Sequence, residues 1–200
     1  MLKAGITGGI GSGKTIVCQV FETLGIPVLY ADTVARQLME SDARIIAGVR
    51  NLFGEQAYTG GRLNNKYIGS VVFADKEKLQ QLNALTHPIV IQYGADWMAR
   101  QQGDYALKEA ALFFESGSHL SMDVMIGVAA PLELRISRTI QRDGLSRQTV
   151  LDRIAKQMDQ EEKMKRCDFV ILNDEKHSII DQVYTIHKAL LQRLQQTVVL

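Results

Sequence analysis

The sequence of 200 residues predicts an α/β protein in which about five parallel strands are covered by helices on both faces. Short apolar runs alternate along the chain with segments of helical periodicity, which is the pattern of repeated strand–helix units. A glycine-rich loop separates the first apolar run from the first helical segment. The apolar fraction of 46% is ample for one core, so we expect a single domain.

The glycine-rich loop at residues 8–15 reads GGIGSGKT and fits the phosphate-binding pattern of glycine, four residues, glycine, lysine and threonine. Backbone N–H groups of such a loop point at a phosphate, and the following helix adds its free N–H groups. We expect Lys14 to reach the β- and γ-phosphates and the Thr15 hydroxyl to bind Mg²⁺. The residues expected to contact the nucleotide here are Gly9, Ile10, Gly11, Ser12, Gly13, Lys14, Thr15 and Ile16. A glycine turn that only caps a helix is the alternative, and the flanking strand and helix favour the three-layer P-loop NTPase fold.

The first elements are short and regular. We predict a strand at residues 2–6, a helix at 13–24 that Gly25 ends, a strand at 26–30 and a helix at 33–39. Cys18 lies on the apolar face of the first of these helices, so we expect a buried thiol.

Residues 41–103 interrupt this alternation and are predicted to be mostly helical. Helical spacing is present at 45–53 and 76–85, and Pro88 is expected to open a further helix at its first position. We expect the block to form a helical insert that binds the substrate over the active end of the sheet.

The second half returns to alternating elements. The third strand signal lies in 105–107 and 110–114, with no clear boundary between these runs. Further elements are expected as strands at 124–129 and 169–172 and helices at 149–165 and 178–196. The expected division is a core at about 1–40, 104–134 and 166–200, an insert at about 41–103 and a lid at about 135–165.

Asp32 directly follows the second predicted strand. A carboxylate at this edge could hydrogen-bond an acceptor hydroxyl and take its proton during phosphoryl transfer. An aspartate that caps the next helix fits the position equally well.

Arg138 and Arg142 are four residues apart and share a face if the segment is helical, with Arg135 one turn earlier. A mobile arginine segment that closes on the transferring group would stabilise its charge and exclude water. The alternative is a solvated basic face. Glu115, expected at the end of the third strand, could orient the substrate or bind the metal through water, or else be a capping or surface carboxylate.

The overall composition and the absent motifs limit the kinds of molecule that the protein is expected to bind. Lys plus Arg number 23 and Asp plus Glu number 22, so bulk charge does not favour nucleic acid or acidic membranes. No apolar run approaches the roughly 18 residues of a membrane span, and the start lacks a signal-peptide pattern. The four histidines lack paired metal spacing, and the guanine-reading pattern Asn-Lys-x-Asp is absent from the sequence. We expect a cytoplasmic protein that acts on small molecules.

Ordered motifs along nearly the whole chain resemble the dephospho-CoA kinase family. The matching segments are GITGGIGSGK at 5–14, Tyr30-Ala31-Asp32, Val72-Phe73, His87-Pro88, LFFE at 112–115, Arg138 with Arg142-Asp143, and the spaced residues Arg153, Gln157, Lys163, Asp168 and Asn173. The chain departs from the family pattern at Ile16, at Asn64-Asn65-Lys66, at Ala111 and at Cys167.

The resemblance implies a phosphotransferase that uses ATP and Mg²⁺ to phosphorylate the ribose 3′-hydroxyl of dephospho-CoA. It implies that Asp32 is the catalytic base and that Lys14, Arg138 and Arg142 act on the transferring phosphoryl group. The substrate-binding residues implied are Asp32, Lys66, His87 and Glu115, and Asn173 is implied to lie near the adenine of ATP. Another small-molecule or nucleoside monophosphate kinase, or a non-catalytic nucleotide-binding module, remains an alternative.

Overall fold

The computed structural model describes residues 1–197 and divides the chain into two compact units. The first, called the sheet unit here, comprises Met1–Leu29 and Arg100–Leu200. The second, called the helical unit, comprises Tyr30–Ala99 and therefore begins ahead of the expected insert boundary near residue 41.

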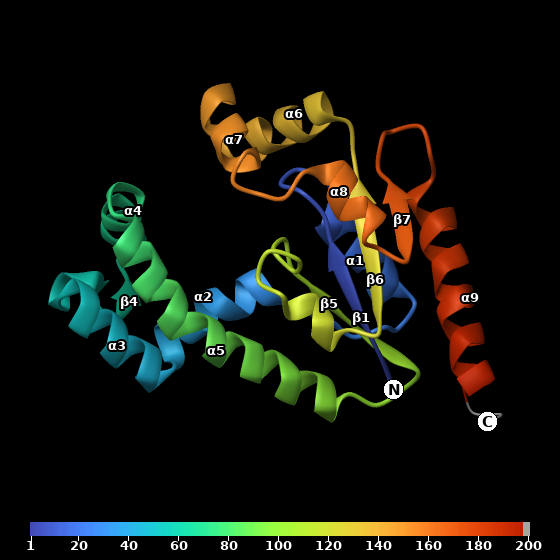
Figure 1. Cartoon of the computed structure of the whole chain (residues 1–200), viewed down its shortest axis with the longest axis horizontal. Helices are drawn as coiled ribbons and strands as arrows, with labels where there is room; N and C mark the ends of the chain where they lie inside the picture. Colours follow the sequence, from blue (N-terminus) through green and yellow to red (C-terminus); the bar gives the residue numbers. More distant parts are fainter. Residues whose placement is uncertain (198–200) are drawn as a thin grey trace. The chain divides into compact units, whose positions relative to one another are not determined.

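A five-stranded sheet forms the centre of the sheet unit (Figure 1). The strand order is β2-β5-β1-β6-β7, and β1 pairs in parallel with β5 and β6, as β6 does with β7. The strands are β1 Leu2–Thr7, β2 Val28–Tyr30, β5 Tyr105–Glu109, β6 Val124–Ala129 and β7 Phe169–Leu172. All residues of β5 and β6 are buried, as expected for strands covered on both faces, which confirms the predicted fold class.

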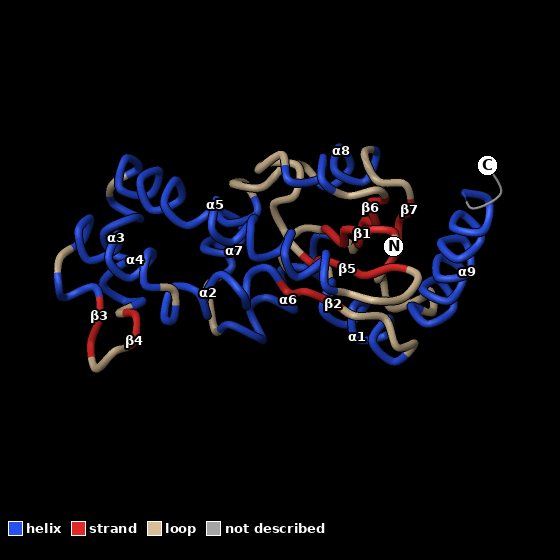
Figure 2. Tube along the Cα trace, turned by 90° about the horizontal axis from the view of Figure 1, so that it is seen from below, coloured by secondary structure: helices blue, strands red, loops and turns tan. Residues whose placement is uncertain are grey.

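Helices of the sheet unit pack on both faces of this sheet. They are α1 Lys14–Thr23, α6 Leu132–Asp143, α7 Arg147–Ile154, α8 Gln160–Lys165 and α9 Ile179–Thr197. Figure 2 shows α1 and α8 on opposite sides of the strands. Cys18 on α1 is fully buried, as predicted, and burial raises the pKa of its thiol.

Two predictions for the sheet unit were wrong. The third strand ends at Glu109, because Phe113 and Phe114 turn away from the sheet and pack with Met125 in a small apolar cluster. The helix expected at residues 149–165 is two helices, since the Asp159 side chain accepts hydrogen bonds from the first N–H groups of α8 and starts that helix anew.

The helical unit has its own apolar core. Its elements are α2 Ala31–Ser41, α3 Ala43–Phe53, a 3₁₀ turn at Glu55–Ala57, β3 Tyr58–Thr59, β4 Arg62–Leu63, α4 Asn65–Ala74 and α5 Lys76–Arg100. The two-stranded β3–β4 hairpin, visible in Figure 2, was not predicted from the sequence. Its residues Tyr58 and Leu63 are buried with Ile45 and Val49 of α3, so the base of the hairpin closes the core while residues 59–62 at its tip are exposed.

Pro88 lies inside α5 and does not open a new helix, which corrects the prediction. Its missing N–H removes one helical hydrogen bond, yet the helix continues through Arg100. Leu82 and Leu85 before the proline and Ile89 after it all pack on the same core cluster. This shared packing holds the two halves of α5 as one helix.

No helix among residues 1–197 is long and apolar enough to cross a membrane.

Candidate functional site

The phosphate loop joins the carboxyl end of β1 to α1 in the sheet unit. Gly11 has φ 76° and Gly13, the N-cap of α1, has φ 90°, both in the left-handed region that favours glycine. A Cβ at Gly11 would also collide with the Arg135 carbonyl oxygen, and one at Gly13 with the Asn173 amide. The two glycines are therefore required both by the backbone turn and by the residues packed behind the loop.

The first turn of α1 is open to a ligand. Its N-cap is Gly13, which has no side chain that could accept hydrogen bonds from the first N–H groups of the helix. Thr15 is exposed in this turn, and Ile16 is 53% exposed. Free N–H groups and the positive end of a helix dipole together favour a bound phosphate.

The Lys14 side chain folds back onto the backbone of the loop. Its Nζ donates to the carbonyl oxygens of Gly8 at 3.0 Å and Gly9 at 3.4 Å. The same nitrogen lies 3.8 Å from Oε1 of Glu109, and the two side chains are only 11% and 8% exposed. Glu109 ends β5 and pairs in register with Ile6 on β1, which brings its carboxylate beside the loop.

Sequence reasoning missed Glu109. The strand signal was extended to residue 114, so Glu115 was expected at the strand end instead. A strand end at residue 109 would have placed an acidic side chain beside the phosphate loop, where P-loop enzymes hold their magnesium carboxylate.

Arg138 is connected to the loop through Asn173. Its guanidinium donates to the Asn173 carbonyl oxygen at 3.1 Å and to Glu175 at 3.1 Å. Nδ2 of the buried Asn173 donates to the Ser12 carbonyl oxygen at 2.9 Å. Arg142 lies on the same helix α6 but forms an ion pair with Asp143 at 2.7 Å, which raises the pKa of Arg142.

Arg135 supports the loop from behind and is only 5% exposed. Its Nε donates to the Ile10 carbonyl oxygen at 3.0 Å, and its Nη1 donates to Oε1 of Gln160 at 3.3 Å. Burial lowers the pKa of this guanidinium, which stays charged because the ordinary value lies far above neutrality.

Glu115 follows the turn after β5 and pairs with the fully buried Lys163, while its own side chain stays 22% exposed. Its Oε1 accepts from Lys163 Nζ at 2.9 Å and from the Met158 N–H at 2.8 Å. Burial opposes the charged form, but these two donors outweigh it and lower the pKa of Glu115. Lys163 is fully buried and also donates to the Ala111 carbonyl oxygen at 2.8 Å.

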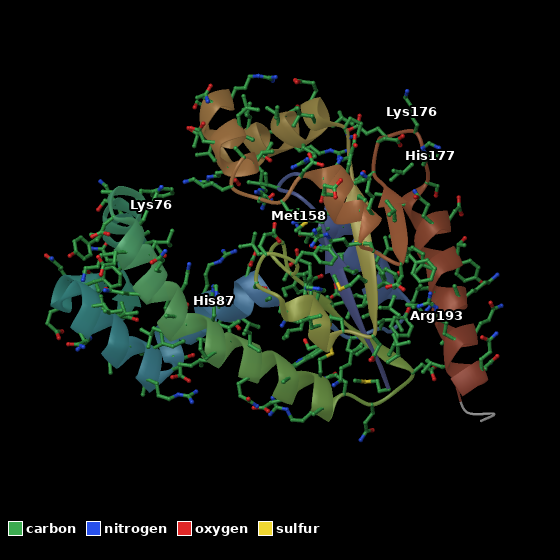
Figure 3. All side chains as sticks on the ribbon, in the orientation of Figure 1. Lys76, His87, Met158, Lys176, His177 and Arg193 are labelled. Carbon is green, nitrogen blue, oxygen red and sulfur yellow. The ribbon has the colours of Figure 1, made fainter. Side chains whose placement is uncertain are left out.

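Three predicted substrate residues belong to the helical unit. Asp32 is exposed in the first turn of α2, whose N-cap is Tyr30, so it is not the residue that caps this helix. Lys66 is exposed in the first turn of α4, and His87 is exposed on α5 (Figure 3). A hollow of about 240 Å³ in this unit is lined by Thr33, Arg36, Gln37, Glu40, Leu63 and Asn65.

The parallel sheet, the glycine loop between β1 and α1, and the arginine helix tied to that loop define a kinase of the P-loop class. A family model described as dephospho-CoA kinase matches residues 2–178. The chain belongs to the dephospho-CoA kinase family.

Individual relatives align with this chain over nearly their full lengths. The dephospho-CoA kinase of Bacteroides fragilis is 36% identical over 194 residues, covering 96% of this chain and 95% of the relative. The crystal structure of TT1252 from Thermus thermophilus superposes with a TM-score of 0.85 at 35% identity, covering 95% and 97% of the two chains. The dephospho-CoA kinase from Campylobacter jejuni gives a TM-score of 0.70 at 26% identity with the same coverage.

Proposed function

We propose that this chain transfers the γ-phosphoryl group of ATP to the ribose 3′-hydroxyl of dephospho-CoA, yielding coenzyme A and ADP. The observation that carries the proposal is the family match over residues 2–178, which includes both the phosphate loop and the whole helical unit. The reaction is the final step of coenzyme A biosynthesis, and the cytoplasm, where ATP and this acceptor are found, is its proposed location.

The donor side of the proposal uses the sheet unit. Residues 9–16 bind the phosphates of ATP, and Lys14 offsets the charge of the β- and γ-phosphates. Arg138 is already linked to the loop through Asn173, and Arg142 on the same helix is proposed to exchange Asp143 for the phosphoryl group. Asn173 remains proposed to lie near the adenine.

Magnesium fits the oxygen donors beside the loop. This ion prefers octahedral oxygen ligands and is usually held by one or two protein groups together with phosphates and water. The exposed Thr15 hydroxyl and the Glu109 carboxylate at the end of β5 are donors of this kind. When bound, Mg²⁺ would neutralise charge on the phosphates.

The acceptor side uses the helical unit. Asp32 orients the 3′-hydroxyl and removes its proton, and Lys66 and His87 bind the acceptor. Glu115, from the sheet unit, stays a proposed acceptor contact. Arg36 lies four residues after Asp32 and lines the hollow of this unit. Its guanidinium is proposed to bind an anionic part of the acceptor.

An ADP-release assay with a panel of acceptors tests the function directly. Dephospho-CoA is expected to give turnover, and nucleoside monophosphates are not. Turnover with a nucleoside monophosphate but not with dephospho-CoA would establish the rival kinase. ATP binding without turnover of any acceptor would establish a non-catalytic module.

Replacement of Asp32 tests the base assignment. Asp32→Ala is expected to lower kcat by roughly 10²–10⁴-fold, the usual contribution of a positioned base, while the Kd for ATP stays near its original value. Asp96→Ala is the matched control, because Asp96 is an exposed aspartate of the same unit that accepts a hydrogen bond from Gln92 in its own helix. Near-normal turnover in folded Asp32→Ala protein would exclude the assignment.

A further inference from the structure

The outer turn of the phosphate loop is fixed at Ile10 by two side chains from distant parts of the sheet unit. The Ile10 N–H donates to Oε1 of Gln157 at 2.9 Å. The Ile10 carbonyl oxygen accepts from Nε of Arg135 at 3.0 Å. The peptide groups on both sides of this residue are therefore oriented by residues that lie outside the loop.

Gln157 belongs to the segment between α7 and α8, and this segment is itself anchored. The next residue, Met158, lies beside α8 in Figure 3, and its N–H donates to Oε1 of Glu115 at 2.8 Å. The same oxygen accepts from Nζ of Lys163, which is fully buried on α8, at 2.9 Å. The buried Lys163 ammonium group thus holds the Glu115 carboxylate in place. That carboxylate in turn holds Met158, the neighbour of Gln157.

Arg135 and Gln157 are not equivalent supports. The Arg135 side chain fills the space behind Gly9, so its removal would leave a cavity under the loop. Gln157 is half-buried and contributes one hydrogen-bond acceptor, so it can be changed without that damage. Gln157 is therefore the residue at which an effect on the loop can be separated from an effect on the fold.

We propose that Gln157 is a positioning residue for ATP, held by the Lys163–Glu115 pair through Met158. The Gln157 side chain accepts the hydrogen bond from the Ile10 N–H and fixes the outer turn of the loop. The other N–H groups of the loop therefore face the phosphate site before ATP binds. A loop ordered in advance loses less conformational freedom on binding, and this increases affinity. The inference rests on the ATP-dependent activity proposed above but concerns only the donor half of the site.

Gln157→Met tests the proposal because methionine has a similar length but lacks the strong acceptor. We expect the Kd and the KM for ATP to rise about 3–10-fold, the effect of one neutral hydrogen bond. The kcat at saturating ATP and the KM for dephospho-CoA are expected to stay within about twofold. Gln148→Met is the matched control, because Gln148 is exposed on α7 and donates a hydrogen bond to Asp152 on the same helix.

A second pair of variants tests the anchor. Lys163→Met alone leaves Glu115 without its buried cation and is expected to weaken ATP binding at least as much as Gln157→Met. The double variant Lys163→Met/Glu115→Gln removes both charges but keeps an acceptor for the Met158 N–H. It is expected to fold and to bind ATP within about threefold of the unmodified protein.

An unchanged Kd for ATP in folded Gln157→Met protein would overturn the proposal. So would a uniform loss, in which Tm, kcat and both KM values deteriorate together, because this is the result of a purely structural role. If the unmodified protein bound ATP but failed to phosphorylate dephospho-CoA, the proposed function would fall. The Kd comparison would still decide the role of Gln157.

Discussion

Lys14 and Glu109 form an ion pair with 3.8 Å between Nζ and Oε1, although they come from the loop after β1 and from the end of the neighbouring strand β5. Both side chains are about nine-tenths buried, so solvent screens this pair much less than a surface pair. A carboxylate in this position repels a naked triphosphate but attracts a divalent cation. If the chain uses Mg²⁺ as proposed, the charge of Glu109 is expected to couple nucleotide binding to magnesium.

Glu109→Gln is expected to strengthen ATP binding in the absence of magnesium but to weaken the use of magnesium in turnover. Loss of the negative charge should tighten binding of Mg²⁺-free ATP about tenfold and raise the Mg²⁺ concentration for half-maximal turnover about tenfold. Calorimetric titration with and without Mg²⁺ measures the first effect, and a magnesium titration of activity measures the second. Glu161→Gln, an exposed change in the same unit, is the control. Equal behaviour of the two variants would contradict the coupling.

The loop and the sheet were predictable because their signals are local. Glycine spacing over residues 8–15 and apolar runs of the right length depend on neighbours in sequence, and the structure confirms the strands predicted at residues 2–6, 124–129 and 169–172. Lys14 and Thr15 follow directly from the same motif. Asp32 was located by the strand before it, and the structure adds that Tyr30 is the helix N-cap.

The missed features depend on tertiary packing. Phe113 and Phe114 read as strand residues, but a cluster with Met125 draws them into a turn, so Glu109 was overlooked. Arg135 was expected at most to extend the lid, yet its guanidinium is buried behind the loop. No periodicity in the sequence indicates which arginine of α6 points inward.

Gly11 gives a test of the loop geometry. Gly11→Ala forces a side chain into the left-handed region and into the Arg135 carbonyl oxygen, so the loop must shift. We expect the Kd for ATP to rise at least about 100-fold, since several phosphate contacts depend on this turn. Gly144→Ala is a matched control, because Gly144 has φ +65° but a Cβ added there would meet no atom within 4 Å. A similar loss of ATP affinity in both variants would show that backbone strain alone is responsible.

The Glu115–Lys163 pair predicts a dependence of stability on pH. The pKa of Glu115 is lowered from its ordinary 4.5, so the charged carboxylate stabilises the folded state above that value. This stabilisation is lost as the pH falls through the folded pKa. Glu115→Gln should cost about 1–3 kcal/mol of unfolding free energy near pH 7, and less as the pH falls below about 4.

Urea denaturation of both proteins at several pH values measures the Glu115 effect. Glu133→Gln serves as the control, because Glu133 pairs with Arg147 on the surface and its removal should change stability far less. A constant difference between Glu115→Gln and the unmodified protein from neutral to acidic pH would contradict the prediction.

Pro88 gives a test of the helical unit alone. Proline costs about 3 kcal/mol relative to alanine inside a helix, and here apolar packing on both sides offsets that cost. Pro88→Ala restores the missing N–H while leaving Leu85 and Ile89 in place, so the free energy of unfolding should rise by about 1–3 kcal/mol. Gln92→Ala, an exposed change on the same helix, should have a much smaller effect. If Pro88→Ala instead lowered stability, the proline would be fixing a bend that the packing of α5 requires, and the continuous-helix explanation would be wrong.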